Sequence, residues 1–327
     1  MLMPIVALVI GLAVLVWSAD KFIDGAANTS KILGVPPLVI GMLVIGFGTS
    51  APEMVVSVFA AAQGNPGLAL GNAFGSNITN IALVLGISAL LLPMTVSSGI
   101  LRRELPMLLG VTLLAGYQIL DGEISRLDAV VLLVVFVAVL IWTLRQNGST
   151  EDQLAADTSH GPLSDQPPLK QSIVWLVIGL MLLVLSSRVL VWGAVEIATS
   201  LGVDELIIGL TIVALGTSLP ELAAAIVAIR RSEHDLALGN LIGSNLFNTL
   251  AVVGLAGAIR PLQVASEVLT RDWMLMLVLT VLLTAFAWRP KSWQPMRPAR
   301  INRLEGGVFV AIYVGYISWL IIGVMIA

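Results

Sequence analysis

Two glutamates lie inside long apolar stretches of the sequence, where carboxylates are rare. Glu53 is near the middle of the stretch 36–62. Glu221 is near the middle of 205–229, and the other eighteen acidic residues lie in connections or within a turn or two of the end of a stretch. An ionisable group at the centre of a bilayer costs about 2.5–3.5 kcal/mol even on the most lenient scale. The two glutamates therefore predict a functional site buried in a membrane.

The residues around each glutamate predict an interrupted helix. Gly48 and Pro52 flank Ser50 in mid-stretch, where glycine and proline make an unbroken helix difficult to maintain. Ser50-x-x-Glu53 has the spacing of a capping box, so one interpretation is that the motif only caps a half-helix. A break also frees backbone carbonyls beside a carboxylate, and a hard cation prefers such oxygen ligands.

Polar pairs in the next apolar stretches could form the opposite wall of this site. Each pair has i,i+4 spacing and so shares a helix face: Ser76 with Asn80, and Ser244 with Asn248. Asn77 and Asn245 lie about 100° further round the helix, and a bond to neighbouring backbone is the alternative for them. One such pair is more typical of helix–helix hydrogen bonding than of a ligand set. Here the pair occurs twice, and each copy is only a short connection away from a buried glutamate. This favours the ligand interpretation.

The ligand inventory consists of oxygen atoms. The chain has no cysteine, and both histidines, His160 and His234, are expected in connections. Oxygen ligation selects Ca²⁺, Mg²⁺, Mn²⁺, Na⁺ or K⁺ and argues against Zn²⁺ or Cu. Two negative charges neutralise one divalent ion, two monovalent ions or two protons. A site that can be balanced in either way suits exchange.

The composition indicates which elements position these residues. Of 327 residues, 57% are apolar and 11% charged, which excludes a soluble globular enzyme, a disordered chain and a nucleic-acid-binding protein. An α-helix needs about 20 apolar residues to cross a bilayer. We therefore expect an all-α membrane protein with ten transmembrane helices. Their approximate ranges are 4–25, 36–62, 68–92, 104–120, 127–144, 172–198, 205–229, 236–259, 272–288 and 306–326.

The distribution of lysine and arginine predicts the orientation. With the N-terminus outside, thirteen of the seventeen basic residues fall in inner connections. Both termini are therefore expected outside, without a cleaved signal peptide. The longest connection, 146–171, is rich in acidic residues, serine, glycine and proline, and is predicted to be a cytoplasmic linker. The basic residues left outside are Arg126, Arg188, Arg260 and Arg271.

The sequence repeats itself with an offset of 168 positions. The run Leu68–Asn72 matches Leu236–Asn240 letter for letter, and about 22 of the 53 positions from Gly34 to Gly86 are identical to their partners. Glutamate, asparagine, serine and threonine are among the matches, which chance similarity of apolar helices would not produce. The halves are 1–145 and 172–327, and an odd number of five spans in each predicts opposite orientations in the membrane. Inverted repeats with interrupted helices are typical of secondary transporters.

At these residues the chain resembles the calcium:cation antiporter superfamily, which includes the sodium/calcium exchangers, and it is most similar to the short YrbG-like bacterial members. The superfamily carries two copies of G-T-S-x-P-E followed by G-S-N-x-x-N/D. The first copy here is Gly48–Glu53 with Gly75–Asn80. The second copy is Gly216–Glu221 with Gly243–Asn248. The resemblance covers essentially the whole chain.

The resemblance implies a ten-helix exchanger of the sodium/calcium exchanger-like fold, in which the first and sixth helices slide past a core that holds the ions. Glu53 and Glu221 would ligate Ca²⁺, with Na⁺ competing for the same oxygens. The other implied ligands are Thr49, Ser50, Ser76, Asn80, Thr217, Ser218, Ser244 and Asn248, with backbone carbonyls near Gly46 and Ala214. Well-studied relatives have an acid at the position of Asn248, so the stoichiometry and the choice among Na⁺, K⁺ and H⁺ stay open.

We therefore expect an antiporter in a bacterial-type cytoplasmic membrane that exchanges Ca²⁺ against Na⁺, with H⁺ or K⁺ as other counter-ions. It would need no cofactor, and its partners would be cations and membrane lipid, with no nucleic acid. A monomer would suffice. The alternatives are exchange of another cation pair, a passive cation channel and, disfavoured because no histidine or lysine lies in a span, an intramembrane enzyme. Arg188 aligns with Asp20 and is expected to snorkel at a helix end.

Overall fold

The computed structural model describes residues 2–146, 167–202, 214–288 and 299–326. The first half consists of helices interrupted by three π-helical segments, labelled η. They are α1 (Leu2–Leu33), α2 (Pro37–Ile40), η1 (Gly41–Ile45), α3 (Gly46–Thr49), α4 (Ala51–Ala62), α5 (Pro66–Ile78), η2 (Thr79–Leu85), α6 (Gly86–Leu91), η3 (Ile100–Glu104), α7 (Leu105–Gln118) and α8 (Arg126–Gln146).

The second half repeats much of this order. Its described helices are α10 (Leu169–Ser200), α12 (Ala214–Thr217), α13 (Leu219–Arg230), α14 (His234–Leu246), η7 (Phe247–Val252), α15 (Val253–Ile259), η8 (Val268–Trp273), α16 (Met274–Ala287) and α17 (Arg303–Ile326). Two expectations about connections are wrong, because His234 begins α14 and α10 begins inside the expected linker. His160 and most of the linker lie outside the described residues.

Seven helices in the described part of the chain are long and apolar enough to cross a membrane, and a bent pair adds an eighth. The bent pair is Pro37–Thr49 with Ala51–Ala62, at an angle of 45°. Of the ten expected spans, 104–120 corresponds to η3–α7, which does not meet the same test, and 205–229 is only partly described. The chain is therefore a helical membrane-type protein, as its composition predicts.

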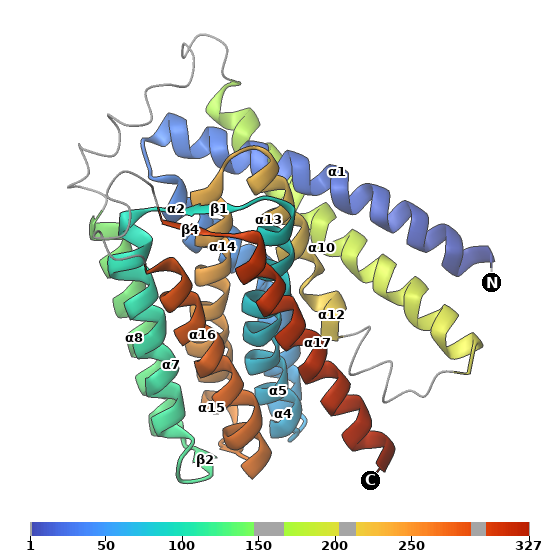
Figure 1. Cartoon of the computed structure of the whole chain (residues 1–327), viewed down its shortest axis with the longest axis vertical. Helices are drawn as coiled ribbons and strands as arrows, with labels where there is room; N and C mark the ends of the chain where they lie inside the picture. The colour runs from blue at the N-terminus through green and yellow to red at the C-terminus, as the bar shows by residue number, and fades with distance from the viewer. Residues whose placement is uncertain (1, 147–166, 203–213, 289–298, 327) are drawn as a thin grey trace.

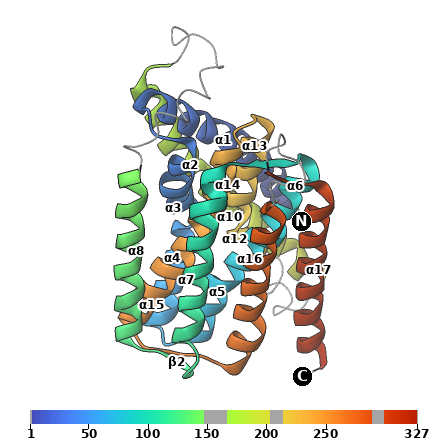
Figure 2. The ribbon, with the colours of Figure 1, turned by 60° about the vertical axis from the view of Figure 1, so that its left-hand side comes forward.

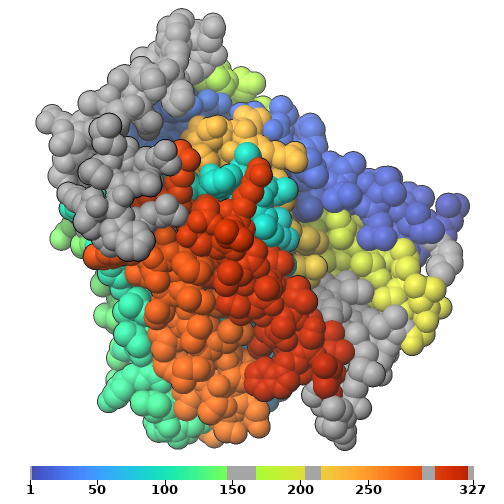
Figure 3. Space-filling model, in the orientation of Figure 1, coloured from blue at the N-terminus to red at the C-terminus, as the bar shows by residue number. Residues whose placement is uncertain are grey.

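Helices α1 and α10 form a slanted pair beside an upright bundle (Figures 1 and 3). They run antiparallel and approach closely at glycines. A Cβ atom at Gly25 would lie 2.6 Å from the Ser172 carbonyl oxygen, and one at Gly179 would lie 2.8 Å from the Phe22 nitrogen. Because only glycine permits such backbone contact, the two helices fit together as one unit.

Some of the helices end at residues with left-handed backbone conformation. Gly34, after α1, has φ +64°, and the amide of Val35 bonds the carbonyl of Ser30, which is the Schellman pattern of a helix end. Gly64 ends α4 in the same way. Its partner 168 positions later is Ser232, which holds φ 62° without being glycine. The connection after α13 is therefore sharply turned.

Two short antiparallel ribbons, which the all-α prediction does not include, connect the halves. Strand β1 (Met94–Val96) pairs with β4 (Ala299–Ile301), and Met94 lies opposite Ile301. Strand β2 (Glu123–Ile124) pairs with β3 (Leu262–Gln263). The first ribbon lies at the same end as α1 and α13, and β2 lies at the other end (Figures 1 and 2). Each ribbon therefore joins one strand from each half at one end of the bundle.

Candidate cation-binding site

Both glutamates lie in the first turn of a helix that follows a break. Helix α3 ends at Thr49, Ser50 has φ −85° and ψ 0°, and α4 begins at Ala51 with a proline in its first turn. In the second half, Ser218 has φ −92° and ψ 5° between α12 and α13. Both glutamates are buried, at 0% and 1% exposure. The N-terminal end of each helix is thus directed at a buried carboxylate, which the helix dipole stabilises.

The capping interpretation of the two serines is wrong for this structure. Neither Ser50 nor Ser218 makes a side-chain capping bond. An N-cap residue normally has an extended backbone, whereas ψ close to 0° at both serines turns the hydroxyl away from the amides of the new helix. The hydroxyl oxygens of Ser50 and Ser218 have no hydrogen-bond partner among the described residues. Both hydroxyls can therefore turn toward another ligand, and that of Ser50 lies beside the carboxylate of Glu221.

The opposite wall consists of α5 with η2 and α14 with η7. The π-helical segments begin at Thr79 and Phe247, which are partners at the offset of 168. Single π-helical turns inside α-helices are frequent at functional sites because they redirect side chains. Here they start between the serine and the asparagine of each predicted ligand pair. All four side chains of these pairs are buried: Ser76, Asn80, Ser244 and Asn248.

Contacts across the two halves bring these walls together. The hydroxyl of Thr49 donates to Oδ1 of Asn240 at 3.2 Å and lies 3.5 Å from the hydroxyl of Ser244. The carboxyl groups of Glu53 and Glu221 are close enough to repel each other. Residues 191 and 195 positions apart along the chain therefore meet at one place.

Backbone contact at glycines makes this meeting possible. A Cβ atom at Gly243 would lie 2.5 Å from the carbonyl oxygen of Met42, and one at Gly46 would lie 3.0 Å from the nitrogen of Ser244. Side chains cannot be accommodated at such distances, so α14 lies directly against η1 and α3. The glycine of the G-S-N motif in the second half is thus required for the position of Ser244.

The buried oxygens of the site lack partners within the described part of the protein. Buried polar groups are normally hydrogen-bonded, so a cluster of unpartnered ones indicates a ligand. The unpartnered atoms include both carboxylate oxygens of Glu53 and Glu221, Oδ1 of Asn77 and Asn80, and Oδ1 and Nδ2 of Asn248. Among the described residues no group of three or more His, Cys, Asp or Glu side chains gathers. Two carboxylates with neutral oxygens fit a hard cation.

The model of one protein family matches almost the whole chain. The description of that family is "Sodium/calcium exchanger protein", and the match covers residues 3–145 and 171–322. The chain belongs to the sodium/calcium exchanger family. It is a YrbG-like member of the calcium:cation antiporters, and hence a transmembrane transporter and not an enzyme.

Relatives of this exchanger extend over its full length. The putative antiporter CaxA of Alkalimonas amylolytica is 42% identical over 97% of this chain and 98% of its own. The inner membrane protein YrbG of Escherichia coli (strain K12) is 39% identical over 98% and 96%. The solved structure of the sodium-calcium exchanger NCX_Mj, soaked with zero Na⁺ and Ca²⁺, matches with a TM-score of 0.83 at 32% identity, over 97% of this chain and 99% of its own. The family relationship thus supports cation antiport involving Ca²⁺.

The remaining predicted ligands have different surroundings in the two halves of the exchanger. The carbonyl of Gly46 accepts the amide of Ser50 at 3.1 Å, so the break does not leave it free. In the second half the amide of Ser218 bonds the carbonyl of Leu215 and not that of Ala214. Thr217 is partly exposed, in contrast to the fully buried Thr49. The two breaks therefore have the same residue types but differ in backbone hydrogen bonding and in burial.

Several asparagines and a threonine of the exchanger site have roles that the sequence did not predict. The amide of Asn77 donates to Oγ1 of Thr249 at 2.8 Å and to the sulfur of Met276 at 3.2 Å. The amide of Asn80 donates to Oδ1 of Asn245 at 3.4 Å. The alternative for Asn77 and Asn245 is a bond to neighbouring backbone. The bonds observed here instead join side chains of the two halves. Asn240 was missed although it lies in the duplicated run.

Proposed function

We propose that this exchanger moves Ca²⁺ against Na⁺ at one central site made of oxygen atoms. The observation that carries the proposal is the pair of buried carboxylates, Glu53 and Glu221, whose four oxygens have no hydrogen-bond partner among the described residues. Uncompensated buried charge is costly and is normally paired or bound to a cation. A cation between the two glutamates supplies that compensation.

The proposed ligand set follows the two breaks and the two π-helical segments. Glu53 and Glu221 supply charge, and hydroxyl and amide oxygens complete the shell. Unpartnered Ser50 and Ser218 support this, because a hydroxyl can turn its lone pairs toward a cation. The remaining proposed ligands are Thr49, Ser76, Asn80, Thr217, Ser244 and Asn248, with the backbone carbonyls of Gly46 and Ala214 in states that free them.

Two carboxylates give a simple charge balance. One Ca²⁺ neutralises both, and so do two monovalent ions, so each loaded form is uncharged and the unloaded form carries two buried charges. Reorientation of the loaded forms alone produces obligatory exchange. Asn248 supplies no third charge, which favours two Na⁺ for each Ca²⁺. Protons or K⁺ could take the place of Na⁺ by the same balance.

We propose ten spans in two inverted halves, joined by a cytoplasmic linker that extends from the end of α8 to the start of α10 and is therefore shorter than the expected 146–171. Two ribbons that each join the halves, at opposite ends of the bundle, support this symmetry. Alternating access would then be a rigid-body movement of one part against another around a fixed site. The distribution of basic residues supports both termini outside.

Uptake of ⁴⁵Ca²⁺ into proteoliposomes tests the proposal. Vesicles loaded with Na⁺, with K⁺, or with only a pH gradient distinguish the three counter-ions. We expect uptake only with Na⁺ inside, and none in Glu53→Gln or Glu221→Gln. Uptake without any counter-ion would indicate a channel, and full uptake by both variants would overturn the proposed site.

A further inference from the structure

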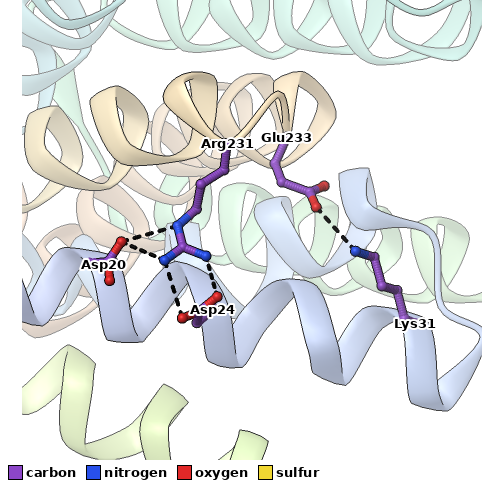
Figure 4. Close-up of polar contacts among 5 residues, drawn as sticks. All are labelled: Asp20, Asp24, Lys31, Arg231 and Glu233. Atoms are coloured by element: carbon purple, nitrogen blue, oxygen red, sulfur yellow. Dashed lines mark hydrogen bonds and ion pairs between the residues drawn. The ribbon is translucent and has the colours of Figure 1, made fainter. Parts of the chain in front are cut away.

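Five charged residues connect α1 to the turn between α13 and α14 (Figure 4). The guanidinium of Arg231 donates to Oδ1 of Asp20 from Nη2 at 2.5 Å and from Nε at 3.1 Å. It also donates to both carboxylate oxygens of Asp24, from Nη2 to Oδ2 at 3.2 Å and from Nη1 to Oδ1. The ammonium of Lys31 lies 3.5 Å from Oε1 of Glu233. We call these five residues the latch.

Both sides of the latch are held in fixed geometry. Asp20 and Asp24 are four residues apart on α1 and so share one face. On the other side, the amide of Glu233 bonds the carbonyl of Ala228 at 2.9 Å, and Ser232 between the two charged residues holds φ 62°. Although burial lowers the pKa of Arg231, the bonds to the two aspartates outweigh it and the pKa is raised. The arginine is thus a permanently charged group in a rigid turn.

The latch connects the slanted pair to the site. Helix α13 carries Glu221 in its first turn, and Arg231 directly follows its last residue. On the other side, α1 is joined to α10 by close contacts at glycines, and the hydroxyl of Ser187 in α10 donates to the carbonyl of Gly216 at 2.8 Å, next to the second break. A movement of the pair along the bundle would therefore separate Asp20 and Asp24 from Arg231.

The repeat-related positions do not form an equivalent latch among the described residues. At the offset of 168, Asp20 corresponds to an arginine and Asp24 to a tryptophan, and both partner positions in the turn become uncharged. Asn65, the partner of Glu233, instead accepts the amide of Leu68 at the start of α5. The corresponding residues are Arg188, Trp192, Thr199, Gln63 and Asn65. Within the described part of the chain, the ion pairs of the latch thus have no counterpart at the repeat-related positions.

The end that carries the latch leaves little space between the asparagines of the site and the ribbon β1–β4. A cavity of about 10 Å³ lies between the asparagines of the site and the ribbon β1–β4, which is at the same end as α1 and α13. It is lined by Asn80 and Asn245 on one side and by Val96 and Ile301 on the other. A cavity of this size is at the lower limit for one water molecule. The space between the asparagines of the site and this ribbon therefore holds at most one water molecule.

We propose that Arg231 is a positioning residue for transport: through Asp20 and Asp24 it docks α1 on the core and favours the state that is closed at the latch end. This inference rests on the proposed exchange, and by the predicted orientation the latch end is cytoplasmic. Since the described residues form no equivalent ion pair at the repeat-related positions, the two faces of the described part of the exchanger are not equivalent. The latch therefore makes the outward-open state the more populated one.

Distance measurements on the full chain in nanodiscs test the position of α1 directly. The sequence contains no cysteine, so spin labels at Leu33→Cys, at the end of α1, and Arg102→Cys, in η3 of the core, are the only two labels. The test variants are Arg231→Gln and Asp20→Asn with Asp24→Asn. Arg230→Gln is the matched control, because Arg230 is exposed and forms no ion pair with a described residue.

We expect either test variant to increase the population with α1 displaced by about fivefold, the effect of a partly exposed ion-pair network worth about 1 kcal/mol. The combined triple variant should show no further change, because all three residues act in one interaction. High salt should reduce the difference from the parent protein. Arg231→Lys should restore part of the docked population.

Transport measured separately on the two faces excludes a merely structural role. With Arg231→Gln, the apparent Ca²⁺ affinity should rise on the latch side and fall on the other, whereas a damaged protein would lose affinity on both. Unchanged distances in both test variants, or equal changes in Arg230→Gln, would overturn the inference. If the parent protein moves no Ca²⁺, the exchange proposal fails, while the distances still decide whether the latch docks α1.

Discussion

Replacing Gly243 with alanine is expected to disrupt the cation site without adding or removing any ligand. The new Cβ atom would lie 2.5 Å from the carbonyl oxygen and 2.7 Å from Cα of Met42, and ordinary contacts begin at 3.4 Å. Helix α14 and segment η1 must therefore separate by about 0.9 Å. Since both partners are backbone, no rotamer change can relieve the contact.

The separation acts on the contacts between the halves. The bond from Thr49 to Asn240 is 3.2 Å long and the contact to Ser244 is already 3.5 Å, so both would exceed hydrogen-bond distance. Overpacking of this kind costs about 1–3 kcal/mol. If the protein relieves that strain by opening the site, the binding-competent state is disfavoured by the same amount. The apparent Kd for Ca²⁺ should then rise by about 5- to 150-fold.

Calorimetric titration of Ca²⁺ into the purified exchanger, alongside ⁴⁵Ca²⁺ uptake, measures this effect. Gly46→Ala is a graded companion, because its Cβ would lie 3.0–3.3 Å from its neighbours and should cause a smaller loss. Gly110→Ala is the control, since it lies on the exposed face of α7 with no described atom within 4 Å. Equal affinity in all three variants, with each protein monodisperse, would refute the role given to backbone contact.

Three further predictions concern the charges and bonds of the site. Glu53→Gln removes the repulsion between its carboxylate and that of Glu221. It should raise the melting temperature of the ion-free protein and abolish stabilisation by Ca²⁺ in a thermal-shift assay; a lower melting temperature would contradict this. Asn248→Asp adds a charge that requires a further cation, so uptake should become sensitive to a valinomycin-imposed potential, and insensitivity would contradict the charge balance. Thr249→Ile leaves the amide of Asn77 without its 2.8 Å partner and should cost about 1–3 kcal/mol in unfolding by denaturant, whereas Thr270→Ser, at an exposed position, should cost little.

The positions of the two helix breaks could be predicted from the sequence because their cause is local. Glycine, serine and proline within one turn disfavour a continuous helix regardless of the surroundings, and both breaks occur at the predicted serine. The role of that serine could not be predicted from spacing alone. A capping box requires a backbone conformation as well as a spacing, and ψ near 0° at Ser50 and Ser218 prevents it.

The partners of the buried asparagines could not be predicted, because their contacts join segments more than 150 residues apart. Thr249 accepts the amide of Asn77, but its partner in the first half is Ile81, which has no acceptor. Because Thr249 and Ile81 are not identical, a comparison of the identical positions of the repeat gives no signal for this hydrogen bond. The ribbons were missed for a different reason, since strands of two or three residues give no periodic signal.

The positions at which the two halves differ explain a property that the identical positions cannot. Identical letters at Glu53 and Glu221 supply two equivalent carboxylates, and a fully symmetric molecule would have equal energies in its two end states. Any preference for one state must therefore come from unmatched residues. Asp20, which corresponds to Arg188, and Glu233, which corresponds to Asn65, are such residues. Both form ion pairs at the latch end, and the corresponding described residues form none. If the proposed exchange holds, the matched positions account for the two carboxylates, and the unmatched ones are where a difference in affinity between the two faces should arise.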